Sequence, residues 1–474
     1  MAALATGIAL GVGFGSIWLN GVFRTKLNAV TMAGTYVLSN VKIPSSILEE
    51  GKGYELDAEG FCLCDMTVSG GKIVSLEKAA GGKGSMMEFT TLDCEGTVLM
   101  PCFVDAHTHM VKNHAHPRAR NPTGSINDAL FIELNDQPRW AACPCCRPIQ
   151  MTGGSDVIID ESLPPCPKAT DVLRRMEFGL ASAYHHGTRA IRTHLDGTNS
   201  SDPKLRATVY EAFQTCRNKY LPKGLEVQGV ANLYLPLWAI PSLADPHVAE
   251  AIQYDGVILG AYCGNVTDTP PEETLKALDA LFAYAQTYKL HVDMHIDETN
   301  DPDCCCMRYA VQSIEKARLA GYKEHVVLGH CTALSLQKAE IRDEVIEGLA
   351  RLNKEYTGAV TVVCNPATNL GLQDRKGSLP PHCITIDANK PRTPMWRGLT
   401  LVQELDAAGV GVSAGSDVSV ESSFCVVSPV CFGSSQVCSV FGICSTVRTC
   451  VIGGIHTGTT MVLRTIVVAL LLDT

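Results

Sequence analysis

The chain has 474 residues, enough for one large domain with a smaller one or for two to three average domains. Its 46% hydrophobic and 19% charged residues are typical of a globular protein with a substantial core. Because the net charge is −10, electrostatics give no reason to expect nucleic acid or an acidic membrane as a partner. The 21 cysteines are irregularly spaced and many lie in apolar stretches, which favours reduced thiols in a reducing compartment.

The beginning of the chain differs from its middle. Residues 1–32 contain the uncharged run "ALATGIALGVGFGSIWL" (3–19), which is shorter than the ~20 residues of a membrane span. Arg24 and Lys26 follow this run, whereas a secretory signal has its basic residues before it. An organelle transit segment, a membrane anchor and an incorrectly assigned start all stay open. A membrane-anchored structural protein is therefore one hypothesis for the chain.

Residues 33–98 predict a small β-rich portion. The stretch "VSGGKIVSL" (68–76) is a strand–turn–strand signal, since two glycines separate two β-branched runs.

Residues 99–418 alternate short β-branched runs with amphipathic stretches of helical length. In one such stretch Leu275, Leu278, Leu281 and Phe282 share a face. The predicted strands are 98–109, 188–196, 226–234, 256–262, 291–298, 325–331, 359–366 and 410–417. This alternation predicts a parallel sheet, and eight strands favour a (β/α)8 barrel of the TIM type. A doubly wound open sheet is the structural alternative.

Two segments do not follow this pattern. Residues 143–167 are rich in Cys and Pro and are predicted to be an inserted loop, in which Cys143 and Cys146 form a lone C-x-x-C, a weak zinc signal. Residues 419–474 form a Cys/Val/Ser-rich tail with neither helical nor strand periodicity. We interpret this tail as unrelated to the barrel, which would leave the barrel incomplete after its eighth strand.

Chemically capable side chains stand where nearly every predicted strand ends. His107 and His109 are one residue apart, so they would project from the same face of a strand. The other strand ends carry His194, Asp196, His295, Asp297, Glu298, His330, Asn365 and Asp417. A single buried histidine is usually structural, but barrel active sites are built where strand ends converge. Nitrogen and carboxylate ligands without thiolate suit one catalytic divalent ion, zinc or iron(II).

The same strand ends lie in motifs of a known family. The segments "PCFVDAHTHM", "RTHLD", "MHIDET", "VVLGHCTAL", "NPATNLGLQDR", "RGLTLVQEL" and "GVGVSAGSD" occur in order between about residue 36 and residue 417. Together they resemble the cytosine deaminase-like branch of the metal-dependent amidohydrolase superfamily. The resemblance implies a barrel over 99–418 and a small β-sandwich portion over 33–98.

The resemblance also assigns roles to the strand-end residues. It implies that His107, His109, His295 and Asp417 bind the metal and that Glu298 is the proton shuttle. His330 would lie beside the metal-bound water, as a ligand or an electrostatic partner, and Asp417 would also orient that water. A surface role for Glu298 and a capping role for Asp417 are the alternatives.

Further residues would line or support the pocket. Asn365 and Gln373 match the pocket-lining segment of the family. We expect His194 to support the site, and we expect Arg192 and Asp196 to form an ion pair beneath it. Cytosine-specific members carry a glutamine at the end of the third strand. Here the corresponding stretch offers Asn232 and Tyr234, which weakens the case for cytosine as substrate.

These features predict a hydrolase or deaminase that attacks a C–N bond of a cyclic amidine or amide with a metal-bound hydroxide. The alternative is a truncated, catalytically inactive remnant, because the sequence departs from the family after Val418. We expect a small heterocyclic substrate, neither a nucleic-acid nor a membrane partner, and leave a homo-oligomer open. The expected location is the cytoplasm, or an organelle if residues 1–32 are a transit segment.

Overall fold

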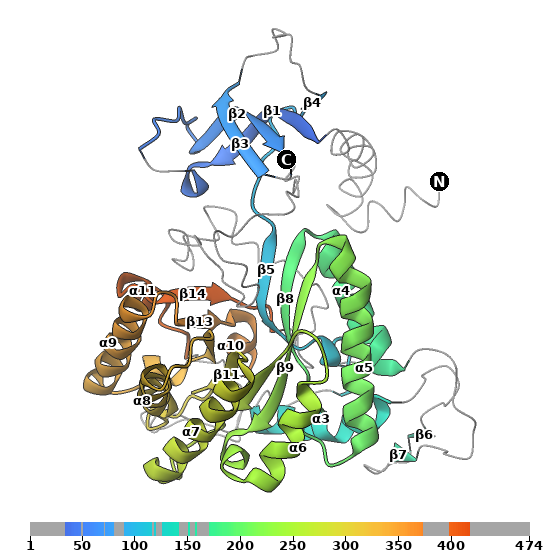
Figure 1. Ribbon diagram of the computed structural model, residues 1–474, viewed down its shortest axis with the longest axis vertical. Helices are drawn as coiled ribbons and strands as arrows, with labels where there is room; N and C mark the ends of the chain where they lie inside the picture. Colours follow the sequence, from blue (N-terminus) through green and yellow to red (C-terminus); the bar gives the residue numbers. More distant parts are fainter. Residues whose placement is uncertain are drawn as a thin grey trace, which may run out of the picture. The chain divides into compact units, whose positions relative to one another are not determined.

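The computed structural model describes residues 34–48, 51–70, 72–79, 90–115, 118–119, 126–141, 150–151, 157–158, 170–372 and 398–417. They belong to two compact units that divide between Cys102 and Phe103 (Figure 1). The predicted extension 1–32 and tail 419–474 lie outside the described residues. Within the predicted insert, the structure describes one short antiparallel pair, β6 (Gln150–Met151) and β7 (Val157–Ile158).

The first unit contains a four-stranded sheet in the order β3-β2-β1-β4. Its strands are β1 (Thr35–Pro44), β2 (Phe61–Ser69), β3 (Lys72–Lys78) and β4 (Thr90–Asp93). β1 runs antiparallel to β2 and parallel to β4. Alternating apolar residues such as Leu38, Met66 and Val68 are buried together, as the period of a strand requires. Among the described residues this unit shows one sheet, and the β-sandwich over 33–98 stays a prediction.

The second unit contains eight parallel strands, and the prediction of a (β/α)8 barrel is confirmed. The strands are β5 (Phe103–Thr108), β8 (Thr188–His194), β9 (Glu226–Tyr234), β10 (Val257–Tyr262), β11 (Val292–Ile296), β12 (Val326–His330), β13 (Val360–Cys364) and β14 (Gly411–Ala414). Each strand pairs with the next of these along the chain. A doubly wound sheet would reverse the strand order partway, so that alternative is wrong.

The first and last strands meet through hydrogen bonds from residues that follow β14 to residues of β5. The backbone N–H of Asp417 donates to the carbonyl oxygen of His107 at 2.9 Å. The backbone N–H and the hydroxyl of Ser416 donate to the two carboxylate oxygens of Asp105, at 2.9 and 2.5 Å. These contacts bring β14 beside β5 and nearly close the barrel.

Helices surround the ring of strands (Figure 1). They are α3 (Ile126–Asp136), α4 (Asp171–His185), α5 (Pro203–Tyr220), α6 (Pro241–Ala251), α7 (Pro271–Tyr288), α8 (Cys306–Leu319), α9 (Ala339–Glu355), α10 (Pro366–Leu372) and α11 (Val402–Ala407). In α7 the predicted apolar face is buried at Leu278, Leu281 and Phe282, whereas Leu275 is half-buried. None of the described helices combines the length and the apolar character needed to cross a bilayer.

Candidate metal centre and pocket

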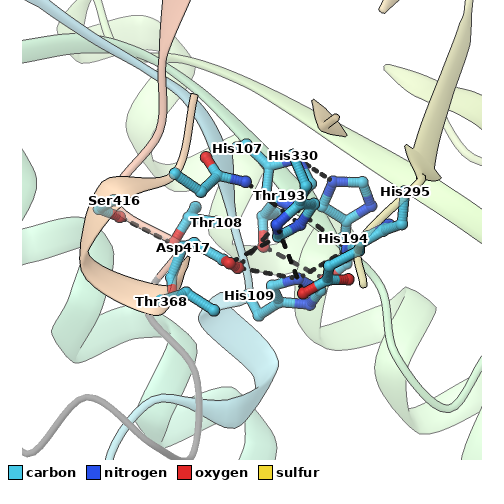
Figure 2. Close-up of polar contacts among 12 residues, drawn as sticks. His107, Thr108, His109, Thr193, His194, His295, His330, Thr368, Ser416 and Asp417 are labelled. Carbon is cyan, nitrogen blue, oxygen red and sulfur yellow. Dashed lines mark hydrogen bonds and ion pairs between the residues drawn. The ribbon is translucent and has the colours of Figure 1, made fainter. Parts of the chain in front are cut away.

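The barrel brings histidines from four strand ends to one place, together with Asp417 (Figure 2). In a parallel barrel all carboxyl ends of the strands open on the same face, so residues far apart in sequence converge there. The residues that meet are His107 and His109 from β5, His194 from β8, His295 from β11, His330 from β12 and Asp417 after β14.

The four predicted ligands lie at the spacing that a metal ion requires. Nε2 of His295 is 3.2 Å from Nε2 of His107 and 3.1 Å from Nε2 of His109. Oδ1 of Asp417 is 3.2 Å from Nε2 of His109 and 3.7 Å from Nε2 of His107. Ligands bound to tetrahedral zinc lie about 3.3 Å from one another, given bond lengths of about 2.0–2.1 Å. The donor set therefore fits one divalent cation.

The outer nitrogen of one of these rings, His109, also favours metal binding. Nδ1 of His109 lies 2.6 Å from Oδ2 of Asp196, and a carboxylate can only accept, so Nδ1 carries the proton. Nδ1 of His107 lies 3.1 Å from Nε2 of His194. Nδ2 of Asn232 can only donate, so Nδ1 of a neutral His194 accepts and its Nε2 donates to Nδ1 of His107. His109 is thus the ring that its outer partner holds with the lone pair of Nε2 toward the metal position.

Burial and neighbouring charges determine the protonation of the ligands. Burial, followed by the neighbouring imidazoles, lowers the pKa of His107 and His295 well below the usual range. Burial would raise the pKa of Asp417, but the hydrogen bond with His109 and the nearby His330 and His107 hold it well below its usual range. Burial disfavours the charged form of His109 as well, yet Asp196 outweighs it and raises that pKa to about 9.

His194 supports this centre from one layer behind it. Its side chain is fully buried, and its Nδ1 lies 2.9 Å from Nδ2 of Asn232. Its Nε2 faces the outer nitrogen of His107, away from the atoms that face the metal position. From this position His194 can orient a ligand through that ligand's second nitrogen, and its supporting role stays a prediction.

The predicted ion pair between Arg192 and Asp196 is wrong. Nη1 of Arg192 lies 2.9 Å from Oδ2 of Asp293, and its Nε and Nη2 donate to the side-chain oxygen of Gln228. Asp196 instead contacts His109 and Lys112. Arg192 lies inside β8 whereas Asp196 follows its end, and four residues of extended chain separate them by about 13 Å. The two side chains therefore belong to different layers of the barrel.

Glu298 and His330 lie together next to His295 in the centre. Oε1 of Glu298 lies 3.4 Å from Nδ1 of His330, and burial raises the pKa of Glu298. Nε2 of His330 lies 3.8 Å from Oδ2 of Asp417 and 3.2 Å from Nδ2 of Asn365. Asn365 is fully buried beside His330, and the described residues that line the cavity do not include it, so its place in the pocket wall stays a prediction.

The backbone at three of these strand ends is left-handed. The φ angles are 50° at Asp297, 69° at His330 and 46° at Asp417, a region that side chains other than glycine seldom adopt. Such conformations cluster at functional sites, where the surrounding structure stabilises them. Here they turn the chain sharply as it leaves the barrel.

A cavity of about 310 Å³ opens over the metal position. Predicted residues in its wall include Asn232, Tyr234, Glu298 and His330, whereas Gln373 lies outside the described residues. The sequence interpretation missed a second group of lining residues, which comprises Lys112, Ile126, Ala129, Leu130, Glu133, Leu134, Gln137, Asn199, Tyr262, Thr368 and Leu372. Five of these eleven residues come from α3, and the one available signal in the sequence was the position of Lys112 three residues after a ligand.

Comparisons with known proteins place these features in context. No protein-family profile matches the chain. The chain is 29% identical over 386 residues to a pterin deaminase of Rhizobium rhizogenes. The aligned residues cover 81% of this chain and 74% of the relative. It is 24% identical over 287 residues to N-isopropylammelide isopropyl amidohydrolase of a Pseudomonas species, and there it spans 60% of the relative's length.

Solved structures show the same fold. A 5-methylcytosine deaminase from Klebsiella pneumoniae matches with a TM-score of 0.59 and 18% identity, over 86% of this chain and 80% of that one. An N-isopropylammelide isopropylaminohydrolase from Burkholderia multivorans matches with a TM-score of 0.51 and 18% identity, over 82% and 75% of the two chains. These structures show the fold alone, whereas the ordered motifs and the curated relatives confirm the resemblance to the cytosine deaminase-like branch of the amidohydrolase superfamily.

Proposed function

We propose that the protein is a metal-dependent hydrolase or deaminase that cleaves a C–N bond of a cyclic amidine or amide in a small heterocycle. One observation carries this proposal: the inner atoms of His107, His109, His295 and Asp417 converge at ligand spacing beneath a cavity whose wall contains Glu298. The names of the curated relatives, a pterin deaminase and an isopropylammelide amidohydrolase, support the same substrate class.

The four residues would hold one divalent ion, zinc or iron(II). Such an ion polarises water and lowers its pKa to about 7, which supplies a nucleophile at neutral pH. His107 and His295 contribute neutral imidazoles and Asp417 an ionised carboxylate, the protonation states that their pKa shifts favour. His109, whose pKa is raised to about 9, would release a proton when the ion binds.

The remaining residues would handle protons and charge. Glu298, whose pKa is raised by burial, would take a proton from the attacking water and pass it to the leaving nitrogen. The water oxygen forms the new bond to carbon, the C–N bond breaks, and the second water proton stays on the ring product. His330 would steady the negative charge that develops on the substrate. Asn232 and Tyr234 would contact the ring from the end of β9.

The first test is elemental analysis of the full chain for zinc and iron, with His295→Ala as the site variant and His325→Asn as a matched control. His325 is also buried, but it directly precedes β12, at the opposite end of the strand from His330. We expect one equivalent of metal in the wild type and the control and its loss in His295→Ala. Folded wild type without metal would contradict the proposed centre.

The second test is turnover of amino- and oxo-substituted pteridines, pyrimidines and triazines by the metal-loaded protein, with release of ammonia or amine as the readout. Turnover that is abolished in Glu298→Gln is the expected result. One equivalent of bound metal without turnover of any heterocycle would favour the inactive remnant instead.

A further inference from the structure

A buried ion pair lies in the wall of the cavity and has no part in the chemistry proposed above. Nζ of Lys112 is 3.0 Å from Oε2 of Glu133 and 3.5 Å from Oδ1 of Asp196. Lys112 ends a short helical turn, η2 (Met110–Lys112), directly after the first strand, whereas Glu133 comes from α3. The side chains of Lys112 and Glu133 are each 10% exposed, and both line the cavity.

The pair retains hydrogen-bonding capacity. An ammonium group has three protons, and the two contacts of Lys112 account for two of them. The carboxylate of Glu133 accepts from Lys112 and, at 3.3 Å, from Nε2 of Gln137, while its two oxygens offer about four lone-pair positions. The cavity therefore has a donor and an acceptor side by side in its wall.

The charges around the pair limit what it can bind. Among the described residues that line the cavity, carboxylates come from Glu133, Asp196, Glu298 and Asp417, whereas Lys112 is the one Lys or Arg. Two of those carboxylates, Glu133 and Asp196, already contact the ammonium group of Lys112. The divalent ion proposed above would offset two more of these four negative charges, which leaves an excess of one. A phosphate or carboxylate on the substrate would add to this excess, so a neutral ring is favoured.

We propose that Lys112 and Glu133 determine specificity by binding a lactam edge of the substrate. Lys112 donates to a ring carbonyl oxygen, and Glu133 accepts from the adjacent ring N–H. This inference rests on the proposed function, because it assumes that the cavity holds a heterocycle. A ring nitrogen without hydrogen directs its lone pair at the carboxylate of Glu133, and an amino group in place of the carbonyl directs hydrogens at the ammonium of Lys112. Such rings lose both contacts.

The test compares matched pairs of ligands that differ at this edge alone: pterin with 2,4-diaminopteridine, and guanine with 2,6-diaminopurine. Binding is measured by calorimetry at neutral pH on the metal-loaded Glu298→Gln protein, so that affinity is separated from turnover. We expect the oxo member of at least one pair to bind roughly 100-fold more tightly than its diamino partner, because a charge-assisted contact is lost in the partner. The preference should fall below about 10-fold when Lys112→Met is added.

Lys316→Met is the matched control, since Nζ of Lys316 forms an exposed ion pair with Asp279 at 2.6 Å on the outer helices. It should keep the full preference. If Lys112→Met does not fold, Glu133→Gln replaces it, because the amide still offers an oxygen to Lys112 but meets the ring N–H less well; the preference should again fall.

Two results would overturn the inference. The first is equal affinity for both members of each pair, which includes no affinity for any of the four compounds. The second is a preference for the oxo member that survives both Lys112→Met and Glu133→Gln. Failure of the proposed function gives a different result. In that case the Glu298→Gln protein binds with the expected preference, but the metal-loaded wild type releases no ammonia from any of the four compounds.

Discussion

The carboxylate of Asp196 lies 2.6 Å from the outer nitrogen of His109 and thereby connects a candidate metal ligand to the wall of the cavity. Its second oxygen lies 3.5 Å from Nζ of Lys112, so one carboxylate contacts both a ligand of the ion and a residue of the cavity wall. Because a carboxylate can only accept, it fixes the proton of His109 on Nδ1 and leaves Nε2 able to bind metal.

Asp196→Asn should weaken zinc binding by about 10–100-fold, because a neutral amide orients the imidazole less firmly and makes it less basic. Competition with a chelator of known affinity measures the change. Asp202→Asn is the control, since Asp202 is exposed and caps α5. Unchanged zinc affinity in Asp196→Asn would show that the charge of Asp196 does not support His109.

Arg192→Met should lower the free energy of unfolding by about 3–5 kcal/mol, because it leaves the carboxylate of Asp293 buried without its ion-pair partner. Arg192→Met combined with Asp293→Leu should recover part of this loss, since neither charge then remains in the core. Urea denaturation of the two single variants and the double variant measures the energetic coupling between Arg192 and Asp293. If the losses of the two single variants add strictly in the double variant, the two side chains are not coupled.

Asp297 should be a positioning residue for Glu298, which follows it directly. Its carboxylate accepts from the backbone N–H groups of Cys306 at 2.8 Å and Met307 at 3.2 Å, at the start of α8. Asp297→Ala should reduce kcat more than it raises KM, even well below the unfolding temperature, and Asp297→Asn should be milder because it keeps an acceptor. The exposed Asp303→Ala is the control. A change in stability alone, with kcat unaltered, would rule out this role.

His325 should make stability depend on pH. Burial lowers its pKa to about 3, and its Nδ1 lies 2.7 Å from the carbonyl oxygen of Gly358. The unfolded chain takes up this proton near pH 6.5 and the folded chain does not, so stability is fully present above pH 6.5 and decreases as pH falls toward about 3.

His325→Asn keeps a donor toward Gly358 but cannot titrate. Between pH 6.5 and pH 4.5 its free energy of unfolding should decrease less steeply than that of the wild type, by up to about 1.4 kcal/mol per pH unit. Thermal or urea unfolding across this range gives the two slopes, and the exposed His186→Asn should retain the wild-type slope. Identical slopes for wild type and His325→Asn would refute the assignment.

The sequence predicts the barrel well because each strand is a compact β-branched run bounded by a turn signal, as at 226–234, which matches β9 residue for residue. It also identifies the strand-end histidines, since convergence at one face follows from parallel strands. It does not predict the partner of Arg192, because that depends on which side chains of neighbouring strands share an interior layer. It likewise misses Glu133, which reaches Lys112 from a helix whose placement over the cavity has no local sequence signal.

The contacts of Asp105 with Ser416 and of His107 with Asp417 join residues at opposite ends of the barrel sequence, and the first pair is 311 positions apart. On the ribosome, β5 is therefore complete long before its last neighbour emerges. His107, His109 and His295 are synthesised before Asp417. The complete set of four ligands therefore forms only at the end of translation of the barrel, after every other strand has emerged.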